Sequence, residues 1–204
     1  MLRAAVALAD RGGIDTLTMR NLGHELGVEA MSLYNHVANK NDLIDGIVDL
    51  VYGEIAPPSD QMGWKTAMRQ RGISVREALM RHPWATSLMH ARTNPGPANL
   101  RHHDSLLGTL RMAGFTLVMA AHAISVIDSY IYGFALQQAS MPLQTPRQLA
   151  KVGEEMLGQM AGDYPHLAEM ITDHALQPGY DYSDEFEFGL DLILDGLERR
   201  RETA

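Results

Sequence analysis

The chain has 204 residues, of which 46% are apolar, so it suits one or two ordinary soluble domains with a substantial core. It has no cysteine, which excludes disulfides, thiolate metal sites and cysteine nucleophiles. The net charge of −8 disfavours general nucleic-acid binding, so any contact with DNA must come from a few well-placed groups.

Neither a signal peptide nor a membrane span is expected. The N-terminus lacks a basic stretch followed by a long apolar one. The longest apolar run, Phe115 to Ile127, is interrupted by His122 and is shorter than the roughly 20 residues that a membrane helix needs. We therefore expect a soluble, cytoplasmic protein with no membrane partner.

The pattern of apolar residues predicts helices throughout, and hence an all-α fold. No segment alternates apolar and polar residues as a half-buried strand does. The segment Ile55–Gly63 contains Pro57-Pro58 and is the clearest boundary. We expect an N-terminal unit at residues 1–46 and a C-terminal unit at residues 47–204, joined by a helix over Asn41–Glu54.

Three short helices are predicted in residues 1–46. The first covers residues 2–11, and the second covers residues 19–26 with Thr18 as its N-cap. Gly27 supplies the left-handed residue that ends the second helix, and the third begins near Glu29. Two short helices joined by a tight glycine turn have the geometry of a helix-turn-helix, which can place its second helix in the major groove of DNA.

The third helix has an apolar side and a polar side. Its apolar side is expected to pack on the second helix and contains Ala30, Leu33 and Val37. The opposite side presents Met31, Ser32, Tyr34, Asn35 and His36. Amide, hydroxyl and thioether groups can contact base edges, as Asn35 would with adenine and Met31 with a thymine methyl. Tyr34 and His36 can reach phosphates.

Two basic residues lie where a DNA backbone would pass. Asn39 is expected to cap the fourth helix together with Asp42, which places Lys40 in its first turn beside exposed backbone N–H groups. Arg20 lies at the start of the second helix, where it can contact the backbone or a groove edge. The alternative is a small three-helix bundle that binds nothing and has Tyr34 and His36 as ordinary surface residues.

The rest of the chain predicts seven further helices, near residues 64–81, 84–91, 99–113, 116–139, 146–161, 164–176 and 184–201. The helix at 116–139 is apolar nearly all round, which indicates burial on several sides. The last helix has one apolar stripe from Phe186 to Leu197 and a second at Phe188 and Leu192. Two such faces favour one for the core and one for a partner subunit, so we expect a homodimer. The alternative is a larger monomeric core.

A small-molecule pocket is expected among the apolar residues of the C-terminal unit. Ten of the thirteen methionines lie beyond residue 60, and methionine lines adaptable pockets as well as filling irregular cores. The candidate pocket residues are Met68, Trp84, Met89, Leu106, Met112, Tyr130 and Phe134.

Catalytic and metal-binding patterns are weak. His102-His103-Asp104, the group Asp163, His166 and Glu169, and Asp173-His174 contain metal-ligating residue types but lack a defined ligand spacing. Solvated helix faces explain them better, and we expect no metal or other cofactor. There is no glycine-rich phosphate loop and no nucleophile elbow, so an enzyme is not expected.

The N-terminal motifs resemble the DNA-binding domain of the TetR family. The resemblance rests on Leu17-Thr18-Met19-Arg20-Asn21-Leu22, Leu26-Gly27-Val28, Leu33-Tyr34-Asn35-His36-Val37 and Asn39-Lys40-Asn41-Asp42-Leu43. It implies phosphate or groove-edge contacts for Thr18, Arg20 and Lys40, and a groove-facing set of Ala30, Met31, Ser32, Asn35 and His36. Tyr34 matches the aromatic residue with which the family contacts DNA.

The C-terminal unit resembles the tetracycline repressor's regulatory domain, at Arg76-Glu77-Ala78-Leu79, Gly114-Phe115-Thr116-Leu117 and Phe186-Glu187-Phe188-Gly189-Leu190-Asp191-Leu192. The residues of the tetracycline site do not carry over: Met89 stands in place of a magnesium-binding histidine, and Arg71 and Leu106 replace the pocket amides. The family usually has a basic N-terminal extension and a longer first helix, whereas this sequence begins almost inside that helix; Val37 replaces the usual phenylalanine.

These resemblances imply a ligand-responsive repressor that binds a palindromic, double-stranded DNA operator as a homodimer. A small-molecule inducer of another kind than tetracycline would release it. The acidic charge and the missing basic arm motivate an alternative, in which the chain is a small-molecule binding protein or enzyme that keeps a degenerate helix-turn-helix.

Overall fold

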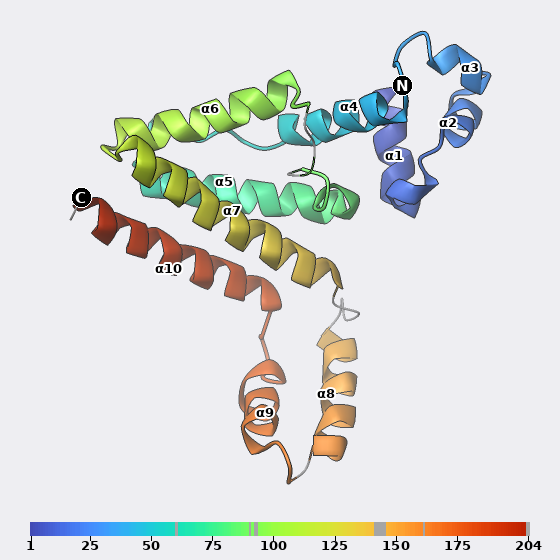
Figure 1. The fold of residues 1–204 in the computed structure, drawn as a ribbon. Coiled ribbons are helices and arrows are strands. Elements are labelled where there is room, and N and C mark those ends of the chain that lie inside the picture. The colour runs from blue at the N-terminus through green and yellow to red at the C-terminus, as the bar shows by residue number, and fades with distance from the viewer. Residues whose placement is uncertain (60, 90, 92–93, 141–145, 161, 203–204) are drawn as a thin grey trace. The chain divides into compact units, whose positions relative to one another are not determined.

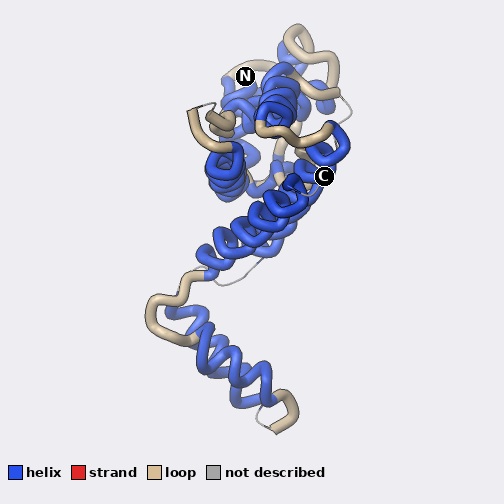
Figure 2. Tube along the Cα trace, turned by 90° about the vertical axis from the view of Figure 1, so that its left-hand side faces the viewer, coloured by secondary structure: helices blue, strands red, loops and turns tan. Residues whose placement is uncertain are grey.

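The computed structural model describes residues 1–204 except 60, 90, 92–93, 141–145, 161 and 203–204. The described residues form helices and loops, with no strand among them (Figure 2), which confirms the all-α fold. The helices are α1 (Leu2–Gly12), η1 (Ile14–Thr16), α2 (Met19–Leu26), α3 (Ala30–Leu33), α4 (Lys40–Gly53), α5 (Trp64–Arg81), η2 (Pro83–Ala85), α6 (Pro97–Met112), α7 (Leu117–Ser140), α8 (Pro146–Met160), α9 (Pro165–Met170), η3 (Ile171–Ala175) and α10 (Tyr182–Glu202).

The chain divides into two compact units. The first comprises Met1–Ala139 and Leu190–Ala204, and the second comprises Ser140–Gly189. In the first unit, α1 to α3 form a small head, and α4 leads from the head along α6 (Figure 1). In the second unit, α8 packs against α9 and η3, where Gly153 lies against Leu176 and Ile171.

The frame of the head follows from its caps and its glycines. The Thr18 hydroxyl accepts a hydrogen bond from the Asn21 N–H at 3.0 Å, so the predicted N-cap is confirmed. Gly27 has the left-handed conformation (φ 67°) that ends α2, also as predicted. Gly23 lets α3 approach closely, because a Cβ there would lie 2.8 Å from the Val28 carbonyl oxygen. The turn between α2 and α3 is therefore set by the local sequence.

Helix α5 contributes many side chains to the core of the first unit, which is mostly apolar. Gly72 of α5 packs against Ile131 of α7 and Leu190 of α10, and a Cβ at this position would lie 2.8 Å from the Leu190 side chain. On α10, Leu190, Leu194 and Leu197 are buried. These contacts join the two sequence segments that make up the unit, Met1–Ala139 and Leu190–Ala204.

Helix α7 is long and apolar enough to cross a membrane by length and composition alone. It is longer than the apolar run that the sequence analysis considered. The core helix of a soluble protein also meets this criterion of length and composition. The middle of α7 contains the buried Asp128, which is paired with Arg71 of α5. Ala120, Ile127 and Ile131 of α7 are buried within the first unit, whereas Val118 and Val126 are exposed.

Three predicted helices differ from the structure. Residues 84–91 do not form an α-helix: a 3-10 turn at Pro83–Ala85 is followed by turns at the described positions. The helix predicted at 164–176 is α9 followed by the π-helical turn η3. The α-helical part of the third helix is only Ala30–Leu33, because the chain continues through turns at residues 34–36. Side-chain periodicity does not distinguish these tighter or wider turns from α-helix.

Candidate DNA interface and ligand cavity

The outer side of α3 and the turn after it carry an exposed set of polar and apolar side chains. Met31 is 75% exposed and Tyr34 is 43% exposed, and Asn35 and His36 are exposed as well. The opposite side holds the structure together, since Leu33 and Val37 are buried. We call Met31, Ser32, Tyr34, Asn35 and His36, together with Arg20 and Lys40, the reading surface.

Two residues of the predicted groove-facing set, Ala30 and Ser32, are less available than the others. Ala30 is only partly exposed, and the Ser32 hydroxyl donates to the Glu29 carbonyl at 2.7 Å. Ser32 therefore keeps its lone pairs free while its proton is used inside the protein. On α2, Leu22 is fully buried, whereas Leu26 is 36% exposed.

Lys40 is the first residue of α4, and the N-terminus of this helix is capped by side chains. The Asn39 side chain accepts from the Asp42 N–H at 3.0 Å, and the Asp42 carboxylate accepts from the Ala38 N–H at 3.0 Å. Lys40 and Arg20 are both exposed, and neither has an ion-pair partner among the described residues. A cation beside a capped helix N-terminus is suited to a phosphate.

Several acidic residues of the head are held by contacts within the protein. Glu25 pairs with Arg11 at 2.8 Å, and Asp42 is part of the α4 cap. Asp10 accepts from the Trp84 indole at 2.6 Å and lies 2.7 Å from the His82 ring. These contacts fix the acidic side chains in place, although the Arg11–Glu25 pair leaves the net charge of the head unchanged because both residues belong to it.

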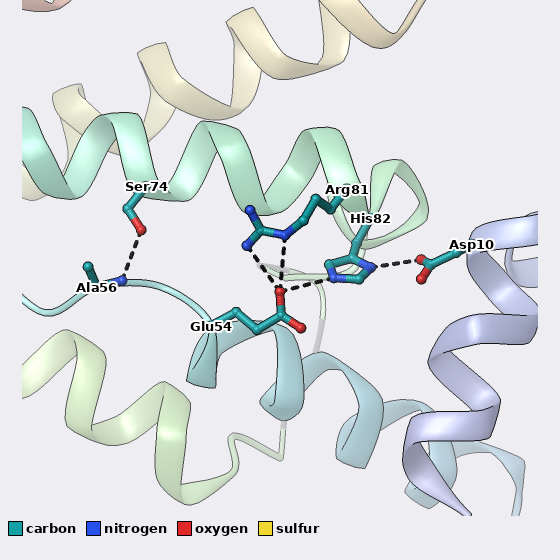
Figure 3. Close-up of polar contacts among 6 residues, drawn as sticks. All are labelled: Asp10, Glu54, Ala56, Ser74, Arg81 and His82. Atoms are coloured by element: carbon teal, nitrogen blue, oxygen red, sulfur yellow. Dashed lines mark hydrogen bonds and ion pairs between the residues drawn. The ribbon is translucent and has the colours of Figure 1, made fainter.

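His82 joins the head to the helices behind it. Its two ring nitrogens lie 2.7 Å from Asp10 of α1 and 3.1 Å from Glu54, and Arg81 donates to the same Glu54 oxygen at 3.0 Å (Figure 3). Carboxylate oxygens only accept, so a ring nitrogen of His82 that carries a proton can donate to the carboxylate beside it. We call Asp10, Glu54, Arg81 and His82 the head clasp.

A second joint connects α4 with α6. The two Asp49 carboxylate oxygens accept from the Ala98 N–H at 3.2 Å and from the Asn99 N–H at 2.8 Å. Asp49 of α4 thus caps the first turn of α6, where free N–H groups attract an anion. Gly96 permits this approach, because a Cβ there would overlap with the Asp49 carboxyl group.

A cavity of about 630 Å³ opens between α6 and α7, within the range of small-molecule sites. Its lining residues are His103, Leu107, Leu117, Ala121, Ile124, Ser125, Asp128, Ser129 and Tyr132. The lining is mostly apolar, and its one carboxylate, Asp128, has a side chain that is only 8% exposed.

Behind the cavity lies a buried polar cluster from three helices, which we call the cavity floor: Arg71, His102 and Asp128. The Arg71 guanidinium pairs with Asp128 and donates from Nη2 to His102 Nε2 at 2.8 Å. Because His102 Nε2 accepts, the proton of a neutral ring must lie on Nδ1. Burial, the Arg71 cation and His103 lower the pKa of His102 to about 3, so it stays neutral.

Two tyrosines border this cluster. Tyr52 donates to the Met89 carbonyl at 3.1 Å, and its ring lies tilted against that of His102 with centroids 5.5 Å apart. Burial is the main cause that raises the pKa of both Tyr52 and Tyr132, so both hydroxyls keep their protons. The inner end of the cavity is therefore polar, ordered and without net charge.

The seven pocket residues predicted from the sequence do not line this cavity. Met68, Trp84, Met89, Leu106 and Phe134 are buried, Tyr130 is partly exposed, and Met112 is 72% exposed. A role of these seven residues in ligand binding therefore stays a prediction. The sequence contained one signal for the cavity that the apolar pattern hid, namely an aspartate in the middle of an apolar helix.

The histidine and carboxylate groups singled out in the sequence have other partners. His102 accepts from Arg71, and His103 Nδ1 lies 3.0 Å from the Asn99 carbonyl. His174 lies 3.0 Å from Glu185 within the second unit. Across the part of the chain that the structure describes, no three His, Asp or Glu side chains are placed to hold a metal ion.

The comparisons with known proteins cover the whole chain. Residues 1–47 match the family model for bacterial regulatory proteins of the tetR family, and residues 56–201 match the tetracyclin repressor-like C-terminal domain. The HTH-type transcriptional repressor DrrR1 of Streptomyces coeruleorubidus is 32% identical, over 100% of this chain and 80% of its own length. The class C tetracycline repressor protein of Escherichia coli is 29% identical, over 100% and 91%.

Solved structures agree with this relationship. A possible TetR family transcriptional regulator from Streptomyces coelicolor A3(2) has a TM-score of 0.79 at 30% identity, covering 97% of both chains. The TetR family protein ActR of Streptomyces coelicolor, in complex with actinorhodin, has a TM-score of 0.79 at 25% identity, covering 98% of this chain and 95% of its own. Together with the exposed reading surface and the cavity, these matches establish that the chain belongs to the TetR family and is a ligand-responsive, DNA-binding transcriptional repressor.

Proposed function

We propose that residues 1–46 act as the DNA-binding domain and residues 47–204 as the regulatory domain of a cytoplasmic homodimer that binds a palindromic operator. The observation that carries the proposal is the reading surface, where contact-capable side chains are exposed on one side of α3 and buried leucine and valine lie on the other. Two such surfaces would enter successive major grooves, about 34 Å apart. The chain would act through binding rather than catalysis.

Apolar faces on α7 and α10 support the homodimer. Val118 and Val126 of α7 are 65% and 47% exposed, and Phe188 and Leu192 of α10 are 65% and 56% exposed. Apolar side chains gathered on exposed helix faces favour burial by a partner. A dimer is also what the charge of the head requires, because a single head with few cations would bind DNA weakly.

The cavity between α6 and α7 is the proposed inducer site. Because α6 lines the cavity and is tied at its first turn to Asp49 of α4, a ligand that shifts α6 would also shift α4. Helix α4 packs against α1 of the head, so the spacing of the two heads would change. A coupling of roughly 1–3 kcal/mol is enough to release the operator. The complex of the related ActR with actinorhodin supports a small organic inducer.

The direct test is an electrophoretic mobility shift with DNA from upstream of the protein's own gene. We expect a salt-sensitive complex at sub-micromolar protein on a palindrome in this region, and a dimer in sedimentation. Failure to retard any palindrome there would favour the alternative, a small-molecule binding protein with a degenerate helix-turn-helix. The acidic composition, with a net charge of −8, is the observation that keeps this alternative open.

A further inference from the structure

The cavity between α6 and α7 changes in polarity along its length. Leu117 and Ala121 lie at one end of α7, and Asp128 and Tyr132 lie at the other. Leu117 and Tyr132 are fifteen positions apart on α7, which corresponds to about 22 Å of helix at 1.5 Å per residue. The site is therefore elongated, with an apolar end and a polar end.

Two groups at the polar end, Asp128 and His103, can be assigned as hydrogen-bond acceptors from their partners. One oxygen of Asp128 is engaged by Arg71, and its other oxygen has no donor among the described residues. His103 Nδ1 lies 3.0 Å from the Asn99 carbonyl oxygen, which only accepts, so Nδ1 must carry the proton. In the neutral ring, His103 Nε2 is then an acceptor too. A ligand that reaches this end can donate to Asp128 and His103, while the Ser129 and Tyr132 hydroxyls can either donate or accept.

The charges of the cavity floor decide which donor fits. The Arg71 cation and the Asp128 anion cancel, and His102 is neutral, so the floor carries no net charge. A ligand carboxylate would meet the Asp128 anion, and a ligand ammonium would meet the Arg71 cation behind it. Either ion would be desolvated without a counter-charge of its own. An uncharged hydroxyl loses little on entry and gains a charge-assisted hydrogen bond.

We propose that this cavity takes an uncharged, elongated amphipathic molecule with a hydroxyl group at one end, which donates to Asp128, and that it rejects the corresponding carboxylate. This inference rests on the proposed inducer site and adds the chemical class of its ligand.

Three probes with one ring system test the proposal: 1-hydroxypyrene, pyrene-1-carboxylate and pyrene. Their binding to the full chain is measured by fluorescence anisotropy at pH 7, where a phenol keeps its proton. We expect 1-hydroxypyrene to bind about tenfold more tightly than either other probe, the size of one hydrogen bond to a charged acceptor.

Variants can separate the role of Asp128 in ligand binding from its role in folding. Asp128→Asn leaves Arg71 unpaired and is at risk of unfolding, so the main variant replaces the pair together, Arg71→Met with Asp128→Leu. The matched control is Asp191→Asn, which removes a carboxylate that pairs with Arg69 on the surface. We expect the double variant to bind 1-hydroxypyrene and pyrene equally, and the control to keep the tenfold preference.

Two results would overturn the proposal: equal affinity of the wild type for all three probes, or tighter binding of pyrene-1-carboxylate. A hydroxyl preference that survives in the double variant would also overturn it, because Asp128 would then not be the acceptor. No DNA is present in this assay, so its failure is distinguishable from a failure of operator binding in the mobility shift.

Discussion

The reading surface and the cavity floor use polar side chains in opposite ways. The reading surface exposes them on a four-residue helix and the turn after it, and Arg20 and Lys40 have no ion-pair partner among the described residues. The cavity floor buries them, and there each polar group has a partner from another helix, as Arg71 of α5 has in Asp128 of α7.

This difference separates the requirements of binding from those of stability. An exposed side chain that contacts only its ligand can be removed with little effect on the fold. A buried charge cannot, because its partner would be left uncompensated in a low-dielectric interior. The two regions should therefore respond differently to substitution, and the following predictions test that contrast from the largest effect to the smallest.

Asp128→Ala should destabilise the protein by about 3–5 kcal/mol, because it leaves the buried Arg71 cation without a counter-charge. Replacing both residues, Arg71→Met with Asp128→Leu, should recover most of the loss. Urea unfolding followed by circular dichroism measures both. The control is Asp191→Asn on the surface, with an expected cost below about 1 kcal/mol. Similar costs for the buried and the surface variant would remove the contrast.

His82→Ala should cost about 1–3 kcal/mol, since it removes a ring whose nitrogens lie beside two carboxylates of the head clasp. The loss should be smaller than for Asp128 because Trp84 still donates to Asp10 and Arg81 still donates to Glu54. Urea unfolding again gives the value. His166→Ala, whose side chain is 97% exposed, is the matched histidine control and should leave stability unchanged.

Lowering the pH should reduce the stability of the folded protein through His102 of the cavity floor. Its pKa is lowered from 6.5 to about 3 in the folded protein, so only the unfolded chain gains a proton between these values. Stability from this group is therefore complete above pH 6.5 and decreases as the pH falls, by up to about 2 kcal/mol at pH 5. His102→Gln should lose less stability than the wild type between pH 7 and pH 5. Parallel pH profiles of the two proteins would contradict this account.

Tyr34→Ala and Lys40→Ala should each weaken operator binding by about tenfold while changing stability by less than about 0.5 kcal/mol. Both side chains are exposed and each would lose a DNA contact only. Mobility shifts and urea unfolding measure the two quantities. Tyr164→Ala and Lys151→Ala, exposed residues outside the head, serve as controls. Wild-type affinity in both head variants would show that the reading surface is wrongly placed.

Local sequence was enough to predict the head. The N-cap at Thr18, the left-handed turn at Gly27 and the cap at Asn39 depend on contacts within a few residues, and the structure confirms each of them. Helical periodicity also separated the buried Leu33 from the exposed Met31. It missed the end of α-helix at Leu33, because turns and helices share the same side-chain spacing over a few residues.

Sequence by itself therefore determined the all-α fold, the helix-turn-helix and the family, because each depends on short-range patterns with fixed spacing. Only the tertiary structure decided which residues form the cavity and its floor. Arg71, His102 and Asp128 come from three helices and meet at distances that no single periodicity encodes. The same holds for the head clasp, where Asp10 and His82 are brought together by packing. Local interactions fix local geometry, whereas buried ion pairs depend on how whole helices pack.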